Sequence, residues 1–257
     1  MNNTNVPLWI PYVRIFITFI TRSIFPSHVI DPKNVLAKVD QEAKKGKGLL
    51  IVYTHFGYRD GIEVNRSLIL KSPVLRTREV INPISFHQYT KTLGNITRFL
   101  HGEIFPVVND DTLQRKGYEH LPKGQGLPAF IARSSQVLLQ GGVVTLAVNA
   151  GRRAYLDMED IQKPVGYFIA ATGAKQCTHY GVLLVSLSID GVTDYDTKAI
   201  RGMNFGKTYL LTIGKYYDVT ELLEQKEVQG KAGNVDAFVR KKLAEVVPKE
   251  YQHAPGK

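Results

Sequence analysis

A histidine and an aspartate separated by four residues, His55 and Asp60 in the segment THFGYRD, are the strongest candidates for chemistry in this chain. A neutral imidazole is a good general base near neutral pH. A carboxylate on its other ring nitrogen would fix the tautomer and stabilise the imidazolium. The pair could therefore take a proton from a hydroxyl group or from water. The spacing alone fits equally well a surface histidine in a turn, with Asp60 as the N-cap of a helix.

Two arginines form a second candidate. Arg152 and Arg153 follow an apolar run that ends at Val148, with Asn149 and Gly151 in between. Arginine presents a planar fork of donors that matches the geometry of a phosphate group. The two side chains could therefore hold a substrate phosphate near the histidine. They could also be solvated arginines on the surface of a basic protein, and the residues alone favour this second interpretation.

Both candidates come directly after short apolar runs. Leu49–Tyr53 is rich in branched side chains, which predicts a strand buried on both faces, as in a parallel sheet. Val143–Val148 predicts a second strand of this kind. Active sites of open α/β sheets gather at the carboxyl ends of the strands. The sequence therefore predicts that His55 and residues 149–153 lie at one edge of a sheet.

The rest of the chain alternates between strand and helix patterns. Further strands are predicted at Ile104–Val108, Val182–Ile189 and Thr208–Ile213. Helices are predicted at Val35–Lys44 with Asp31 as its cap, and at Gly61–Lys71, Ala129–Gln140, Val165–Ala171 and Val235–Val246. This alternation indicates an α/β fold with a mostly parallel sheet flanked by helices. A chain of 257 residues fits one large α/β domain, or one such domain with an appendage.

The chain is basic, with a formal net charge of +10 and a pI of about 9.5. Such a charge favours an anionic partner: nucleic acid, an anionic membrane surface or a phosphorylated substrate. No module with aromatic residues interleaved among Lys and Arg is present, so nucleic acid is not expected. Cys177 is the single cysteine, and no His, Cys and Asp cluster has zinc spacing, so neither an internal disulfide nor a metal is expected. The other six histidines, His87 among them, have no recognisable partner and are interpreted as surface or core residues.

Residues 6–25 form the most apolar stretch of the chain. No Lys or Arg precedes it and Arg14 interrupts it, which does not fit a signal peptide. The part between Pro11 and Pro26 is too short to span a membrane comfortably. Polar residues at helical spacing, Arg14 and Thr18 among them, fall on one narrow face, and apolar residues cover the rest. The pattern predicts a helix lying in the membrane surface, with packing against the protein's own core as the alternative.

The order of several short motifs resembles that of the glycerolipid acyltransferases, the family of glycerol-phosphate and lysophosphatidic acid acyltransferases. THFGYRD at residues 54–60 resembles the first motif, His-x4-Asp after an apolar strand. GEIF at Gly102–Phe105 resembles the second, G-x-I-F. GGVVTLAVNAGRR at Gly141–Arg153 resembles the third, an apolar strand that runs into F-P-E-G-T-R. LVSLSI at Leu184–Ile189 resembles the strand of the fourth, and VVPKEY at Val246–Tyr251 is similar to the common L-P-x-x-Y ending.

The resemblance covers residues 45–252 and departs from the family pattern on the side that anchors the substrate. Asn149 stands where the third motif usually carries glutamate, and Val148 where it usually carries proline, whereas Arg152 keeps the arginine position. The second motif lacks its usual arginine after Phe105. The base and its carboxylate are retained. The departures therefore concern the identity of the substrate more than the type of reaction.

The resemblance implies particular roles for individual residues. His55 and Asp60 would be catalytic, and the substrate would contact Gly57, Arg59, Gly102, Asn149, Gly151, Arg152 and Arg153. The reaction would transfer a fatty acyl group from acyl-CoA or acyl-carrier protein to the hydroxyl of a lysophospholipid, most naturally 1-acylglycerol-3-phosphate, in phospholipid biosynthesis. Acyl-CoA or acyl-carrier protein would be a co-substrate, and no cofactor or metal would be needed.

The resemblance and the charge together imply a location. Residues 1–30 would form a membrane-interface helix, and residues 31–257 the acyltransferase domain. The protein would lie at the cytoplasmic face of an anionic phospholipid membrane, as a peripheral or monotopic protein. Three alternatives stay open: an acyltransferase for another lipid acceptor, a lipid hydrolase that uses the same pair to activate water, and a non-enzymatic basic protein that binds anions.

Overall fold

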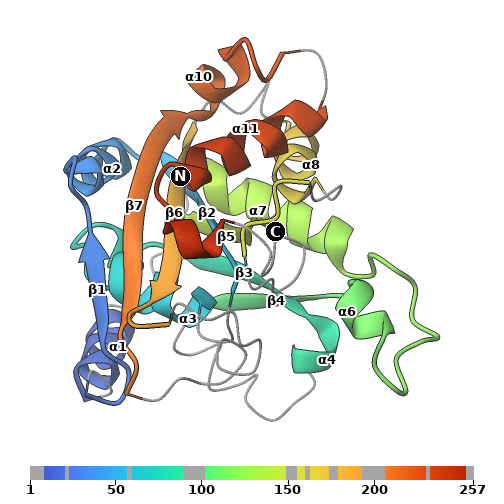
Figure 1. Ribbon diagram of the computed structural model, residues 1–257, viewed down its shortest axis with the longest axis horizontal. Coiled ribbons are helices and arrows are strands. Elements are labelled where there is room, and N and C mark those ends of the chain that lie inside the picture. The colour runs from blue at the N-terminus through green and yellow to red at the C-terminus, as the bar shows by residue number, and fades with distance from the viewer. Residues whose placement is uncertain are drawn as a thin grey trace.

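The computed structural model of the protein describes residues 9–20, 23–56, 60–89, 102–148, 155–159, 163–173, 179–192, 206–229 and 232–252 (Figure 1). Within these residues the strands are β1 (Ser27–Ile30), β2 (Gly48–Tyr53), β3 (Val80–Ser85), β4 (Glu103–Val107), β5 (Val143–Ala147), β6 (Tyr180–Ile189) and β7 (Tyr209–Asp218). The helices are α1 (Trp9–Ile20), α2 (Val35–Lys44), α3 (Asp60–Val64), the π-helix η2 (Asn65–Ile69), the 3-10 helix η3 (Leu75–Thr77), α4 (Phe86–Tyr89), α6 (Asp110–Leu113), α7 (Leu127–Leu139), α8 (Pro164–Ala171), α10 (Val219–Glu224), α11 (Ala232–Ala244) and the 3-10 helix η4 (Lys249–Tyr251).

The described strands form one sheet in the order β1-β7-β6-β2-β5-β3-β4, with β2 at its centre. Neighbouring strands are parallel except for β6 and β7. The predicted α/β fold with a mostly parallel sheet flanked by helices is therefore confirmed. Tyr53 at the end of β2 pairs with Ala147 at the end of β5, so these two strands end at the same edge of the sheet.

The strands predicted from the sequence are all present, with ends that differ by a few residues, but β1 and β3 were not predicted. β1 has only four residues. β3 contains Pro83, and proline within a run argues against a strand because it lacks the N–H that a ladder needs. The pairing of β3 with β5 ends at Ile81, so Pro83 interrupts no bond on that side.

The first two predicted helices are confirmed with one difference. α2 spans the predicted residues, and both carboxylate oxygens of Asp31 cap it by accepting the N–H groups of Val35 and Leu36 at 2.8 and 2.9 Å. The helix predicted at residues 61–71 begins as α3 and continues as the π-helix η2. A π-turn within a helix is uncommon and is often found near functional sites.

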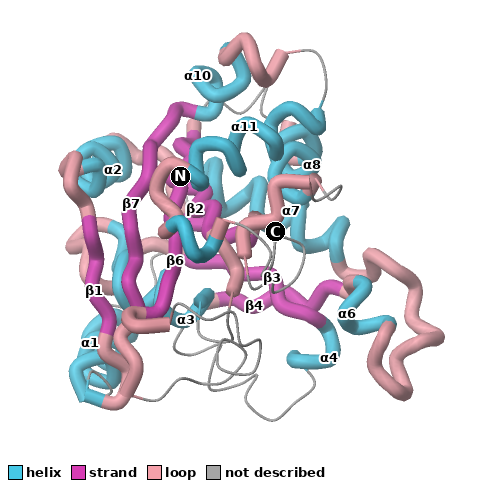
Figure 2. The backbone as a smooth tube through the Cα atoms, in the orientation of Figure 1, coloured by secondary structure: helices cyan, strands magenta, loops and turns pink. Residues whose placement is uncertain are grey.

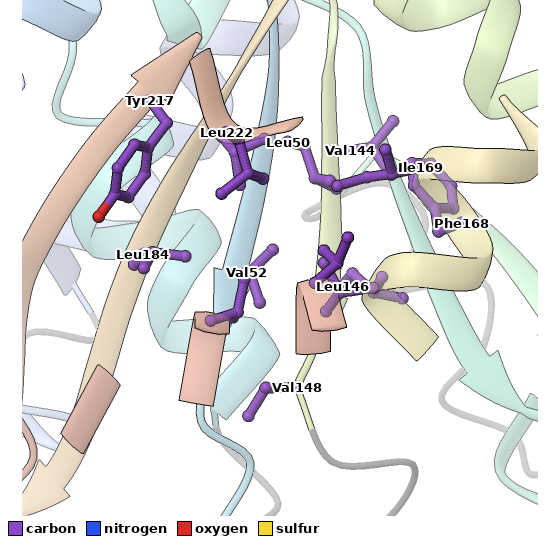
Figure 3. Packing of buried hydrophobic residues seen from close by; sticks show 14 of the residues in the cluster. Leu50, Val52, Val144, Leu146, Val148, Phe168, Ile169, Leu184, Tyr217 and Leu222 are labelled. Atoms are coloured by element: carbon purple, nitrogen blue, oxygen red, sulfur yellow. The ribbon is translucent and has the colours of Figure 1, made fainter. Parts of the chain in front are cut away.

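The side chains of β2 alternate between the two faces of the sheet, and helices cover both faces (Figure 2). Leu50 and Val52 belong to the core beneath α7, α8, α10 and α11, where Figure 3 shows Leu50 beside Val144 and Val52 beside Leu146 of β5. Leu49 and Ile51 belong to the second core, beneath α2 and η2. When this alternation continues into the loop after β2, successive residues of that loop point to opposite faces of the sheet.

The N-terminal helix α1 presents an apolar face to solvent. It begins at Trp9, and Pro11 lies in its first turn, where proline is tolerated because that N–H has no helical partner. Tyr12, Phe16 and Phe19 are spaced so as to share one face, and Phe19 is 73% exposed. None of the helices in the described part of the chain is long and apolar enough to cross a membrane.

The sheet begins earlier than the expected domain boundary after residue 30. Ser27, the first residue of β1, pairs with Tyr209 of β7, and Tyr209 pairs with Ile189 at the end of β6. β6 and β2 are parallel, so Ser27 lies at the edge where both of these strands end. The chain from α1 therefore enters the sheet at the edge where β2 and β6 end, and Figure 1 shows α1 beside the start of β1. His55 follows β2 at this edge.

Candidate functional site

The candidate site begins where the central strand β2 ends. Thr54 follows the strand and is fully buried. Its Oγ1 accepts a hydrogen bond from Leu187 N at 2.8 Å, and its own N–H donates to Val185 O at 3.2 Å. These bonds extend the pairing of β2 with β6 and fix the backbone that presents His55.

His55 and Asp60 meet at this edge, with 3.1 Å between His55 Nδ1 and Asp60 Oδ2. A carboxylate accepts hydrogen bonds, so Nδ1 is the donor of this contact, and in the neutral imidazole this tautomer leaves the lone pair on Nε2. The side chain of Asp60 is 1% exposed, whereas that of His55 is 25% exposed. The imidazole is therefore oriented by a buried carboxylate and remains accessible, which is the arrangement that a general base requires.

Asp60 also holds the loop between β2 and α3. The oxygen that faces the histidine, Oδ2, accepts the N–H of Phe56 at 2.5 Å. Asp60 is the first residue of α3, so one carboxylate joins the ring of His55, the loop and the helix. This role exceeds that of a helix cap, which would need only the N–H groups of its own helix.

Tyr53 fills the space beside the histidine. Its ring lies edge-on to that of His55, with 6.1 Å between the centroids. Burial, reinforced by the charge of Asp60, raises the pKa of the Tyr53 hydroxyl, which therefore stays neutral. A Cβ at Gly61 would lie 3.3 Å from Tyr53 Oη, so the glycine lets the first turn of α3 pack closely over the tyrosine.

A network of amide and hydroxyl groups ties α3 and η2 to the sheet. Asn65 Nδ2 donates to Gly61 O at 2.9 Å and to Asn82 Oδ1 at 3.1 Å. Thr145 Oγ1 of β5 donates to the same Oδ1 at 2.5 Å. The helix that begins with Asp60 is thus fixed to both β3 and β5, and Asn65 and Thr145 are buried.

A buried ion pair ties the same helix to the segment that follows α1. Arg66 Nη2 lies 2.8 Å from Glu63 Oε2, and the two side chains are 7% and 0% exposed. The same nitrogen donates to the carbonyl oxygen of Phe25 and, at 3.2 Å, to Ser27 Oγ. The chain leaving α1 is therefore held directly on the helix that carries Asp60.

A polar cluster lies at the carboxyl ends of β3 and β4. His87 Nδ1 is 3.2 Å from Thr112 Oγ1, and Asn109 Oδ1 accepts the N–H and the hydroxyl of Thr112 at 3.0 and 2.9 Å. Asn109 Nδ2 donates to Ser85 Oγ at 2.9 Å. His87, for which the sequence showed no partner, is a buried and hydrogen-bonded residue at the same edge as His55. Its partner lies 25 positions away in the sequence, beyond the reach of any short motif.

Most of the residues predicted to contact the substrate lie outside the described part of the chain, namely Gly57, Arg59, Asn149, Gly151, Arg152 and Arg153. The chain after β5 is described as far as Val148, whose N–H donates to Tyr53 O at 2.8 Å. Val148 is therefore paired with β2 next to the loop that carries His55. The place of the two arginines relative to the histidine stays a prediction.

Gly102 does not join this site. Its φ is +86°, and a Cβ there would lie 2.4 Å from Val80 O, so the glycine serves a close backbone contact. Val80 is level with Val143, which pairs with Leu49 at the start of β2. With a strand rise of about 3.3 Å per residue, Leu49 is roughly 20 Å from His55. The structure thus gives Gly102 a structural role at the opposite edge of the sheet, and its contact with the substrate stays a prediction.

Within the described residues, no three His, Cys, Asp or Glu side chains gather in a way that could hold a metal ion. No family model matches this chain. A search of curated proteins finds no match either. The case for a function therefore depends on the residues of this chain, on their geometry and on the order of its motifs.

Proposed function

We propose that the protein is an acyltransferase that moves a fatty acyl group from a thioester to the hydroxyl of a lysophospholipid. One observation carries the proposal: the partly exposed His55 has its Nδ1 on the buried carboxylate of Asp60, at the end of the central strand. An imidazole held in this way can take a proton through Nε2. Among reactions that need such a base, the order of the motifs favours acyl transfer.

In the proposed reaction, His55 Nε2 takes the proton of the acceptor hydroxyl. The oxygen forms a bond to the carbonyl carbon of the thioester, and the carbon–sulfur bond then breaks. The imidazolium gives its proton to the departing thiolate. Asp60 stabilises the imidazolium between these two transfers. A hydroxyl and a thioester thus become an ester and a thiol, with no covalent acyl-enzyme.

The acceptor that we propose is 1-acylglycerol-3-phosphate, and the donor is acyl-CoA or acyl-carrier protein. Arg152, with Arg153 beside it, would hold the acceptor phosphate through its donor fork. Both substrates are anionic, and the formal net charge of +10 would raise their concentration near the protein. The same charge favours the anionic cytoplasmic face of a membrane.

The exposed apolar face of α1 supports a membrane-surface location. A helix with such a face lies at the boundary between lipid headgroups and acyl chains. The chain from α1 enters the sheet at the edge that carries His55. Docking through α1 would therefore bring the base close to the hydroxyl of a lipid held in the same surface.

Purified protein incubated with acyl-CoA or acyl-carrier protein donors and a panel of lysolipids, read by mass spectrometry, tests the proposal. We expect a diacyl product and free thiol in equal amounts. Free fatty acid without a diacyl product would favour the hydrolase alternative. His55→Ala protein purified in parallel controls for contaminating activity, and the absence of both products would contradict the proposal.

The double variant Phe16→Ser/Phe19→Ser should bind anionic vesicles at least roughly tenfold more weakly, because burying each phenylalanine is worth about 1.5–3 kcal/mol. Substitution is preferable to truncation, because the residues just after α1 contact Arg66. The matched control is Leu139→Ser/Tyr167→Ser, which removes two exposed apolar side chains elsewhere. Flotation in a density gradient measures binding, and equal losses in both double variants would show that α1 is not the anchor.

Arg152→Ala should mainly raise the KM for the acceptor, with a smaller loss of kcat if the arginine binds more tightly in the transition state. Arg152→Lys should restore activity only in part, because an ammonium group cannot form the two parallel bonds of a guanidinium. Arg76→Ala, in η3 at the opposite end of the strands, is the control. Steady-state kinetics that are the same for all four proteins would show that Arg152 does not contact the substrate.

A further inference from the structure

Tyr251 packs against the loop that carries His55. It lies in η4 and is 3% exposed. Its ring contacts that of Phe56, with 5.0 Å between the centroids. Phe56 directly follows His55, and its N–H donates to Asp60 Oδ2 at 2.5 Å. The backbone of Phe56 thus touches the pair on one face of the sheet, while its side chain touches Tyr251 on the other.

The hydroxyl of Tyr251 is fixed at the end of β6, the strand beside β2. Tyr251 Oη donates to Val192 O at 2.9 Å and accepts from Ile189 N at 3.3 Å. Burial raises the pKa of this hydroxyl despite the opposing bond from Ile189 N, so that it stays protonated and able to donate. The ring therefore has a defined place relative to the central strands.

The backbone of Tyr251 makes a second contact, with Leu156. Leu156 N donates to Tyr251 O at 2.7 Å, and Leu156 is fully buried in the same core as Phe56. Leu156 follows the segment that carries Arg152 and Arg153 in the sequence. Tyr251 thus contacts both the loop after β2 and the chain at Leu156.

We infer that Tyr251 is a positioning residue for the proposed acyl transfer: it sets the Phe56 backbone, and through it Asp60 and His55, relative to the end of β6 and to Leu156. The inference depends on the proposed function and adds to it a role for the VVPKEY ending. Misplacement of a catalytic group by about 1 Å can cost roughly 10²-fold in rate. The bond from Phe56 N to Asp60 Oδ2 connects the Tyr251 ring contact to the pair.

Tyr251→Leu should lower kcat by roughly tenfold to a hundredfold and change the KM for the acyl donor little. The matched control is Phe238→Leu. Phe238 lies in α11, and its buried ring belongs to the same core and packs against the ring of Tyr217 in β7. The two changes should destabilise the protein similarly, because each leaves a cavity in one core. Of these two substitutions, only Tyr251→Leu should reduce kcat.

A second pair of variants separates the hydroxyl from the ring. Tyr251→Phe keeps the contact with Phe56 but loses the bonds to Val192 and Ile189, so we expect a loss of kcat of only severalfold. Tyr217→Phe is the control, because the Tyr217 hydroxyl has no hydrogen-bond partner among the described residues. It should leave kcat unchanged.

The ¹⁵N shifts of the His55 ring provide a readout that does not depend on activity. In the wild type we expect a fixed tautomer, with the proton on Nδ1 and Nε2 bare. Tyr251→Leu should give a mixture of tautomers, whereas Phe238→Leu should not. If the wild type shows no acyl transfer, the proposed function fails, and the ring shifts still decide the inference. Equal effects of Tyr251→Leu and Phe238→Leu on kcat, together with an unchanged tautomer, would overturn it.

Discussion

His55→Ala is expected to lower acyl transfer by about 10²–10⁴-fold, the usual contribution of a general base. The fold and the vesicle binding should not change, because the side chain is partly exposed and belongs to neither core. Initial rates with saturating substrates measure the effect, and circular dichroism with vesicle flotation checks the two properties that should stay constant.

Asp60→Asn separates the catalytic interpretation from the alternative of a simple helix cap. Asparagine caps a helix about as well as aspartate, so a cap alone predicts an almost silent substitution. The structure predicts a severe one, because Oδ2 of Asp60 accepts from both His55 Nδ1 and Phe56 N, and the negative charge is lost. A base and its orienting partner act as one unit, so the double variant His55→Ala/Asp60→Asn should be no worse than His55→Ala.

Asp236→Asn is the matched control for this experiment. Asp236 is also fully buried, and its two oxygens accept the N–H groups of Val165 and Gly166 at 2.9 and 2.8 Å. It caps α8 from α11, on the face of the sheet opposite to Asp60. The control should lose stability but keep the kcat of the wild type, whereas a folded Asp60→Asn protein with normal kcat would contradict the catalytic pair.

The contact between His55 and Asp60 could be predicted because its signal is local. The continuous apolar run Leu49–Tyr53 predicts a buried strand, and His55 and Asp60 follow it within a few residues. The surroundings of the pair could not be predicted in the same way. Tyr251, Asn82 and Thr145 come from distant parts of the chain, and only the folded sheet brings them to the helix and loop that follow β2.

The fold, too, could be predicted only where the signal lies in a short stretch of sequence. Strands that are buried on both faces carry continuous apolar runs, and β2, β5 and β6 were found for that reason. β3 was missed because Pro83 interrupts its apolar run. β1 was missed because its four residues are too few to show a strand pattern. No sequence signal separates the π-helix at Asn65–Ile69 from the α-helix that precedes it.

Arg66→Met is expected to lower the free energy of unfolding by about 3–5 kcal/mol, the usual cost of removing one partner of a buried ion pair. Glu63 is fully buried and would lose the guanidinium that faces it. The carbonyl of Phe25 and the hydroxyl of Ser27 would lose their donor as well. Urea unfolding of the purified variant measures the change.

Lys241→Met is the control, because its ion pair with Glu227 is exposed and such pairs are worth only about 0–1 kcal/mol. The double variant Glu63→Leu/Arg66→Met gives a sharper test. Well-packed apolar residues often replace a buried pair at little cost, so the double variant should recover much of the stability that Arg66→Met loses. An Arg66→Met protein as stable as Lys241→Met would mean that the pair does not hold the segment after α1 on the helix of Asp60. In that case another contact would have to fix the orientation of α1 relative to His55.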